Sequence, residues 1–217
     1  MKKVAVILSG CGVYDGSEIH ESVLTLLALS QANAEYQCLA PDILQQRVIN
    51  HFVGHQEPAE TRNVLVESAR IARGDILSTA EAEPSDYHAL IFPGGFGAAI
   101  NLCDYAIKGP SCVVEPSVLK FAEAIALAKK PIGFICISPA LIAKIYGPGV
   151  KMTIGNDKET METLTSMGNN PIECSVTECV IDKTHKVVST PAYMLGKSIA
   201  QVNNGISQLV KAVLAMI

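Results

Sequence analysis

The chain has 217 residues, of which 49% are hydrophobic and 18% are charged, a composition typical of a compact globular protein rather than a disordered or fibrous one. Its net charge is −4 and it has no cluster of lysine and arginine, which argues against nucleic acid as a partner. No apolar run approaches the roughly 18 residues of a membrane span, and the apolar run near the N-terminus is too short for a signal peptide. We therefore expect a single domain, residues 1–217, that binds neither nucleic acid nor a membrane.

The cysteines are odd in number and lack the spacing of a zinc site or a disulfide framework. They are Cys11, Cys38, Cys103, Cys112, Cys136, Cys174 and Cys179. Free cysteines are most often small buried residues in a reducing compartment, so we expect a cytoplasmic protein. His51 and His55 have the spacing of two metal ligands on one helix, but Gly54 between them disfavours a helix. The sequence therefore predicts no metal site.

Apolar runs alternate with helical periodicity along the chain. The expected strands are residues 4–8, 89–92 and 131–135, and the expected helices are residues 18–31, 63–72, 118–128 and 198–216. Uninterrupted apolar runs of this kind are typical of strands buried on both faces. Ser17 is the expected N-cap of the first helix, and Asn33 is its expected C-terminal stop. The alternation predicts parallel βαβ units in a three-layer αβα sandwich.

Two segments depart from this alternation. Residues 178–182 and 186–190 flank a short polar turn and predict a C-terminal β-hairpin. Residues 41–60 carry glycine, proline and few helix signals, so we expect an irregular or hairpin insertion that can form a rim over a pocket. The expected fold class is α/β, with a mostly parallel sheet and a hairpin near its end.

Cys136 follows the third expected strand directly and is the candidate nucleophile. Ligands bind at the carboxyl ends of parallel strands, and Pro139 suits the first turn of a helix. A thiol at a helix N-terminus should have a lowered pKa, because the dipole and the free N–H groups stabilise the thiolate. A tight strand-to-helix turn also directs a side chain out of the sheet. The alternative is a buried cysteine that merely ends a strand.

A glycine pair follows the second expected strand, in Pro93-Gly94-Gly95. Such a pair lets backbone N–H groups face a ligand at the same edge as Cys136. The N–H groups of Gly95 and Ile137 are candidates for an oxyanion hole, and Gly94 is a candidate pocket residue. The alternative is a turn with a purely structural role.

The loop after the first strand offers the thiol a partner. Glu18, His20 and Glu21 all stand near the start of the first helix. A desolvated carboxyl group there can stay protonated and hydrogen-bond the sulfur, or move a proton during turnover. The alternative is that the two glutamates only favour the helix N-terminus electrostatically. Cys11, His20 and Ser138 are the remaining pocket candidates at these strand ends.

Several segments together resemble the DJ/PfpI superfamily of class-I glutamine-amidotransferase-like proteins, and within it the ElbB group (enhancing lycopene biosynthesis protein 2). The segments are residues 6–21, 60–65, 93–99, 133–140 and 189–194. The resemblance implies a flavodoxin-like sandwich, a homodimer and Cys136 as the nucleophile. It favours Glu21 over the runner-up Glu18 as the carboxylate near the thiol, because Glu21 stands twelve residues before Asn33, the position at which relatives end that helix with glycine.

The resemblance also implies an activity and a link to isoprenoid biosynthesis. The expected function is a glyoxalase without cofactor, glutathione or metal, which converts glyoxal or another small 2-oxoaldehyde to the hydroxy acid, glycolate, through a Cys136 hemithioacetal. One alternative is a redox sensor whose low-pKa Cys136 is oxidised. A second is an amidotransferase-like subunit, which is disfavoured because Ile137 stands where some such relatives carry histidine.

Overall fold

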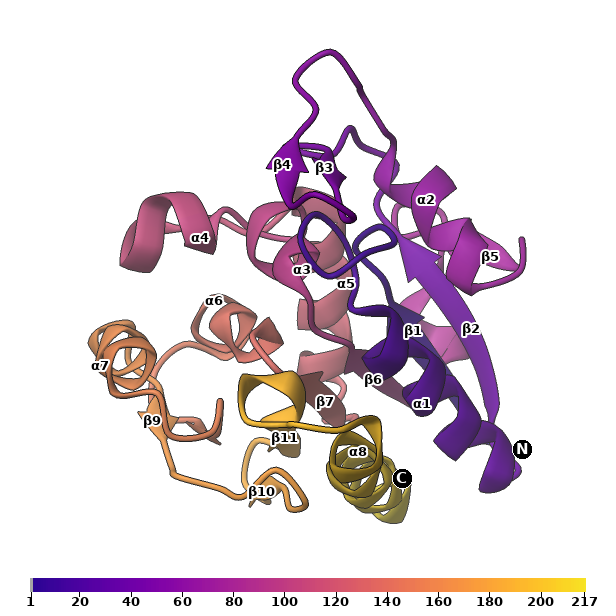
Figure 1. Ribbon diagram of the computed structural model, residues 1–217. Coiled ribbons are helices and arrows are strands. Elements are labelled where there is room, and N and C mark those ends of the chain that lie inside the picture. The colour runs from indigo at the N-terminus through magenta and orange to yellow at the C-terminus, as the bar shows by residue number, and fades with distance from the viewer. Residues whose placement is uncertain (1) are drawn as a thin grey trace.

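The computed structural model describes residues 2–217 and contains a seven-stranded sheet in the order β10-β11-β7-β6-β1-β2-β5 (Figure 1). Its strands are β1 (Lys3–Ile7), β2 (Glu35–Ala40), β5 (Ile76–Ser78), β6 (Ala89–Phe92), β7 (Ile132–Ile135), β10 (Val180–Asp182) and β11 (Val187–Thr190). Neighbouring strands pair in parallel, except that β10 and β11 form an antiparallel hairpin. The expected α/β class, with its mostly parallel sheet and C-terminal hairpin, is confirmed.

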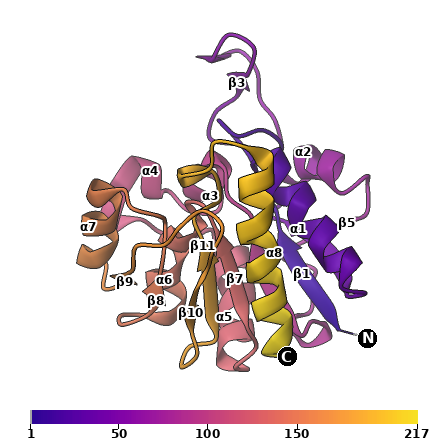
Figure 2. The ribbon, with the colours of Figure 1, turned by 60° about the horizontal axis from the view of Figure 1, so that its bottom comes forward.

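Helices cover both faces of this sheet. They are α1 (Ile19–Gln31), α2 (Val64–Ile71), α3 (Phe96–Ile100), α4 (Tyr105–Lys108), α5 (Pro116–Leu127), α6 (Ile142–Tyr146), α7 (Lys158–Ser166) and α8 (Ile199–Ala215). Helices α1, α2 and α8 contribute to the core on one face, and α3, α5 and α6 to the core on the other. Figure 2 shows α8 running along the face of the sheet. Strands β6 and β7 are buried throughout, as their uninterrupted apolar runs predicted.

The expected strands and helices lie within two residues of their observed bounds, but the cap of the first helix differs from the expectation. Glu18, not Ser17, is the N-cap of α1, and its Oε2 accepts the N–H of Glu21 at 2.6 Å. The hydroxyl of Ser17 instead accepts the N–H of Ser9 at 2.8 Å. Ser17 therefore fastens the loop after β1 and does not cap the helix. Asn33 ends the helix with a φ of 52°, as expected.

The insertion at residues 41–60 contains the two-residue strands β3 (Ile49–Asn50) and β4 (His55–Gln56), which form a small antiparallel hairpin beyond the main sheet (Figure 1). The N–H of Ile49 donates to Asp15 Oδ2 at 2.6 Å, and the N–H of Tyr14 donates to His51 Nε2 at 3.2 Å. The insertion therefore holds the loop after β1. It does not form the expected rim, since none of its residues line the cavity beside Cys136.

A second small pair, β8 (Lys151–Met152) and β9 (Asn170–Pro171), is parallel and lies on either side of α7 in the chain. The sequence analysis did not predict these elements. Within residues 2–217, no helix combines the length and apolar character that crossing a membrane requires.

Gly205 provides a test of the packing of α8. A Cβ atom at this position would lie 2.3 Å from the carbonyl oxygen of Val176 and 2.7 Å from Thr190 Oγ1. Alanine normally stabilises a helix interior by about 1 kcal/mol relative to glycine. Here we expect Gly205→Ala to lower the free energy of unfolding by roughly 1–3 kcal/mol, because the added methyl group overpacks the contact.

The matched control is Asn204→Ala, at the exposed neighbouring position of α8. We expect it to raise stability by a few tenths of a kcal/mol through helix propensity alone. Urea unfolding followed by circular dichroism measures both variants. A Gly205→Ala protein as stable as Asn204→Ala would contradict the close packing of α8 on the segment that contains Val176.

Candidate active site

Cys136 occupies a tight turn directly after β7. Its φ is 62°, a left-handed conformation that a residue other than glycine keeps only where its surroundings hold it. The N–H of Cys136 donates to the carbonyl oxygen of Thr190 at 3.0 Å, so the turn is joined to β11. The hydroxyl of Ser138 accepts the N–H of Ile135 at 2.8 Å and donates to the carbonyl of Phe92 at 3.0 Å. Ser138 therefore supports the turn and does not line the cavity beside Cys136.

Glu21 lies in the first turn of α1 and has no exposed surface. Its Oε2 accepts the N–H of Gly94 at 2.9 Å, and its Oε1 accepts the N–H of Tyr193 at 3.1 Å. The carboxyl group is also hydrogen-bonded to the thiol of Cys136. Three loops that follow β6, β7 and β11 thus meet at one carboxyl group.

Burial raises the pKa of Glu21 to about 8, and the nearby charge of Glu18 contributes to the rise. The N–H groups of Tyr193 and Gly94 act in the opposite direction, because they stabilise the carboxylate. Glu21 is therefore mostly protonated at pH 7. A buried carboxyl group that keeps its proton near neutral pH can both donate and accept protons during a reaction.

Glu18 is the other carboxylate that the sequence left open. Its side chain caps α1 through the N–H of Glu21, and its own N–H donates to the carbonyl of Gly94 at 3.0 Å. Glu18 also lines the cavity beside Cys136. The structure therefore brings Glu21 to the thiol and leaves Glu18 at the cavity wall.

Two backbone N–H groups, those of Gly95 and Ile137, hydrogen-bond the sulfur of Cys136. The glycine pair permits this approach. A Cβ at Gly95, whose φ is 94°, would lie 2.3 Å from the backbone nitrogen of Glu18. A Cβ at Gly94 would lie 2.4 Å from Cys136 Cβ. The two predicted donors are thus brought together beside the thiol, where they can bind an oxyanion that forms there.

The pKa of Cys136 is raised well above its usual value, and the expectation of a lowered pKa is wrong. Burial is the main cause, and the charge of Glu21 is the next. The N–H groups of Gly95 and Ile137 lower the pKa but do not outweigh burial. The turn is followed only by the 3₁₀ turn Ser138–Leu141 and the five-residue α6, so no long helix directs its dipole at the sulfur.

A cavity of about 370 Å³ opens beside Cys136. Its lining is largely apolar and comes from Val13, Glu18, Gly95, Phe96, Ala99, Tyr105, Ala106, Cys136, Ile137, Thr160, Tyr193 and Met194. Sequence reasoning did not assign Tyr193 to the site, although it follows β11 and its segment is part of the stated resemblance. Its N–H orients Glu21 and its side chain forms part of the wall.

Two other predicted pocket residues do not line this cavity. His20 hydrogen-bonds the hydroxyl of Tyr193 through Nδ1 at 2.8 Å, so it lies behind the wall. Cys11 lies within the electrostatic influence of Glu67 and Arg70 of α2, and burial raises its pKa. Neither residue is placed to act on a molecule bound at Cys136.

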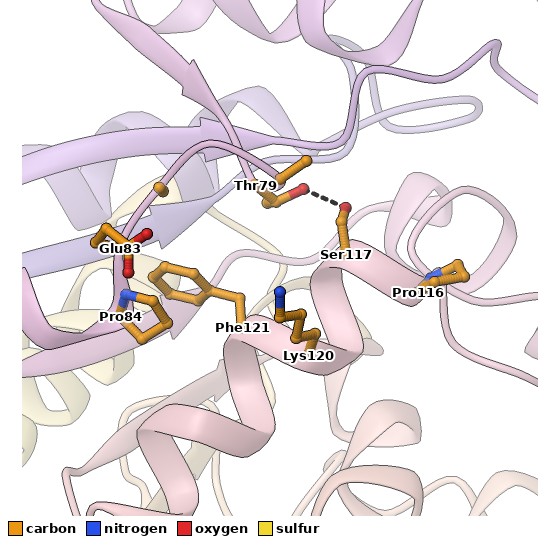
Figure 3. Close-up of a pocket in the computed structure, with 9 residues that line it drawn as sticks. Thr79, Glu83, Pro84, Pro116, Ser117, Lys120 and Phe121 are labelled. Carbon is orange, nitrogen blue, oxygen red and sulfur yellow. Dashed lines mark hydrogen bonds between the residues drawn. The ribbon is translucent and has the colours of Figure 1, made fainter.

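A second cavity, of about 290 Å³, lies between residues 79–84 and α5 (Figure 3). Its hydroxyl groups are partnered within the protein. Ser117 donates to Glu115 Oε2 at 2.6 Å, so Thr79 supplies the proton for the 2.6 Å bond between the two hydroxyls. This cavity shares no lining residue with the one at Cys136.

Comparison with curated proteins identifies close relatives. The chain is 44% identical to the rat ES1 protein homolog, mitochondrial, over 99% of this chain and 84% of that protein. It is 43% identical to human glutamine amidotransferase-like class 1 domain-containing protein 3, mitochondrial, over 99% of this chain and 83% of that protein. The chain belongs to the ES1 family of glutamine amidotransferase-like class 1 proteins. No protein-family model matches it.

Solved structures share the fold of this ES1-family chain. An isoprenoid biosynthesis protein with an amidotransferase-like domain from Ehrlichia chaffeensis is 34% identical, with a TM-score of 0.93 over 100% of this chain and 99% of that one. Glyoxalase III from Candida albicans has a TM-score of 0.64 at 14% identity, over 100% of this chain and 97% of that one, and so shares the fold. The glutamine-amidotransferase-like class 1 character expected from the sequence is confirmed by the human relative.

The expected cytoplasmic location is wrong. The rat and human relatives are both named as mitochondrial proteins, which points to mitochondria rather than to the cytoplasm. Unpaired cysteines indicate a reducing environment, but they do not distinguish one reducing compartment from another.

The buried carboxyl group of Glu21 should make stability depend on pH. Its pKa is about 8 in the folded protein, against an ordinary value of 4.5. Between these values the unfolded chain releases the proton and the folded protein keeps it, so stability falls as the pH rises. Each pH unit corresponds to about 1.4 kcal/mol, so we expect a loss of roughly 4 kcal/mol from pH 5 to pH 8.

Glu21→Gln is the control for this prediction, since its amide does not titrate. The difference between the two proteins isolates Glu21 from other ionising groups. Urea unfolding at pH 5, 6, 7 and 8 measures the slope for each protein. Parallel slopes in the two proteins would show that Glu21 has no raised pKa.

Proposed function

We propose that this chain is a glyoxalase of the ElbB group that converts glyoxal, and other small 2-oxoaldehydes, to the hydroxy acid, glycolate in the case of glyoxal. The observation that carries the proposal is the hydrogen-bonded pair of Cys136 and Glu21, with two N–H donors at the sulfur and an apolar cavity in front of it. The similarity to a protein named for isoprenoid biosynthesis supports the assignment to the ElbB group and the link to isoprenoid biosynthesis.

The first step joins the substrate to the protein. The Glu21 carboxylate takes the thiol proton while Cys136 Sγ attacks one aldehyde carbon, which forms the C–S bond and an oxyanion. The N–H groups of Gly95 and Ile137 stabilise this oxyanion. Glu21 then returns the proton to the oxygen. The product is a neutral hemithioacetal, and Glu21 is again a carboxylate.

The second step moves a hydrogen between the two carbons. Glu21 removes the proton from the hemithioacetal carbon, which leaves an enediolate, and returns this proton to the neighbouring carbon. The hydroxyl proton of the first carbon passes to the alkoxide oxygen of the second, which gives a glycolyl thioester on Cys136. One carbon is oxidised and the other is reduced within the same molecule, so the step needs no external electron acceptor.

The third step releases the product. Water adds to the thioester, Glu21 accepts a proton from the water, and the C–S bond breaks to give glycolate and the Cys136 thiol. The net reaction is glyoxal plus water to glycolate and one proton. Since glyoxal fills only part of a 370 Å³ cavity with largely apolar walls, apolar substituents on a 2-oxoaldehyde can also be accommodated.

The geometry gives less support to the two alternatives. A redox sensor at Cys136 requires a lowered thiol pKa, whereas burial raises the pKa of Cys136. A glutaminase requires a histidine beside the nucleophile, whereas Ile137 follows Cys136 and His20 bonds Tyr193. The homodimer implied by the resemblance is part of our proposal.

Removing either member of the pair should remove the activity. We expect Cys136→Ala to abolish glycolate formation, because no thioester can form. Glu21→Gln should lower kcat by about 10²–10⁴-fold, the usual contribution of a general base. Cys174→Ala is the matched control, since Cys174 is a partly exposed thiol outside the cavity. Glycolate formed from glyoxal is the readout, and an undiminished rate in Cys136→Ala would refute the mechanism.

The rate should rise with pH through the pKa of Glu21. Since the carboxylate form must accept the thiol proton, we expect kcat/KM to increase up to about pH 8, the pKa of Glu21, and then to level off. Initial rates between pH 5.5 and pH 9.5 measure this profile. A rate that is independent of pH, or that falls over this interval, would argue against Glu21 as the base.

A further inference from the structure

A second set of buried thiols, apart from Cys136, consists of Cys103 and Cys112. Cys103 and Cys112 are 3% and 1% exposed, and their thiols are hydrogen-bonded to each other. A short antiparallel bridge between Cys103 and Val114 holds the two segments together, and the N–H of Asp104 donates to the carbonyl of Val113 at 3.2 Å. The paired backbone thus holds the two cysteines on neighbouring segments.

The segment between these cysteines forms one wall of the cavity at Cys136. Residues 104–111 include α4, and Tyr105 and Ala106 line the cavity. The thiol of Cys103 also donates to the carbonyl of Ala98, at 3.3 Å, next to the lining residue Ala99. The thiol pair therefore lies at the base of a wall segment, where a covalent bond would join its two ends.

We propose that Cys103 and Cys112 form a reversible disulfide when the protein meets a hydroperoxide, and that this bond closes the segment that carries Tyr105 and Ala106. The proposal concerns a modification site and does not depend on the proposed glyoxalase activity. Two cysteines held on paired neighbouring segments need little backbone movement to reach bonding distance.

Cys112 is the thiol that reacts first. The neighbouring Cys103 side chain lowers the pKa of Cys112 to about 7, against the effect of burial, and Lys144 lowers it further. Lys144 is held nearby, since its Nζ donates to the carbonyl of Pro110 at 3.1 Å. Ser111 and Val113, on either side of Cys112, are exposed, so a local opening of this surface segment admits a small peroxide.

The two steps balance with one hydrogen peroxide. The Cys112 thiolate attacks one peroxide oxygen, the O–O bond breaks, and the departing hydroxide takes a proton to become water. Cys112 is then a sulfenic acid. The thiol of Cys103 attacks this sulfur, the S–O bond breaks, and a second water leaves. Two thiols lose two electrons in total, and one peroxide is reduced to two waters.

The spacing of the tryptic sites makes the bond directly observable. Lys108 lies between the cysteines, so trypsin places Cys103 in residues 74–108 and Cys112 in residues 109–120, each as its only cysteine. After treatment with equimolar hydrogen peroxide and alkylation of free thiols, we expect the two peptides to appear as one linked species in non-reducing mass spectrometry. Dithiothreitol should separate them, and amide exchange over residues 104–111 should be slower in the oxidised protein.

Variants distinguish the thiol that reacts with peroxide from the thiol that then attacks the sulfenic acid. Cys103→Ser should leave a Cys112 sulfenic acid that dimedone traps, and Cys112→Ser should leave Cys103 unmodified. Cys174→Ser, which changes a partly exposed thiol outside the pair, should leave the linked species unchanged. The proposal is overturned if the wild-type peptides stay unlinked at a peroxide dose that oxidises Cys174, a result that does not depend on the folding of any variant.

Discussion

The arrangement of the site depends on the buried carboxyl group of Glu21. It accepts N–H groups from Gly94, after β6, and from Tyr193, after β11, and it meets the thiol of Cys136 after β7. A carboxyl group without exposed surface needs such partners, because unsatisfied burial of its oxygens is costly. The same bonds join three strand ends to the start of α1. The position of the thiol is therefore coupled to the position of this one side chain.

Burial also decides the protonation of the pair. The pKa of Glu21 rises to about 8 and that of Cys136 rises well above its usual value, with desolvation as the largest cause in each case. The sulfur is thus held as a thiol until a base removes its proton. A carboxylate whose conjugate acid has a pKa near 8 is a stronger base than an ordinary glutamate. Desolvation therefore keeps Cys136 in the thiol form and also makes the Glu21 carboxylate a stronger base, which can remove the thiol proton.

The sequence predicted those features that follow from position along a strand. Buried runs of apolar residues marked β6 and β7, and Gly95 and Cys136 were found because they follow those runs directly. The choice between Glu18 and Glu21 could not be made from the residues alone, because both stand in one turn near a helix N-terminus. Only the packing of α1 against the loop after β6 determines which carboxyl group is buried. The contribution of Tyr193 gave no side-chain signal, since its backbone N–H makes the contact with Glu21.

The pKa of a cysteine could not be predicted from its place at a strand end, and the two buried thiols Cys112 and Cys136 show why. Both are at most 8% exposed, yet the pKa of Cys112 is lowered and that of Cys136 is raised. Cys112 lies beside the Cys103 side chain and near Lys144, and both stabilise its thiolate. For Cys136, burial is the largest cause of the raised pKa, and the negative charge of Glu21 adds to it. Burial thus raises the pKa of both thiols, and the partners supplied by the tertiary fold determine whether that effect is outweighed.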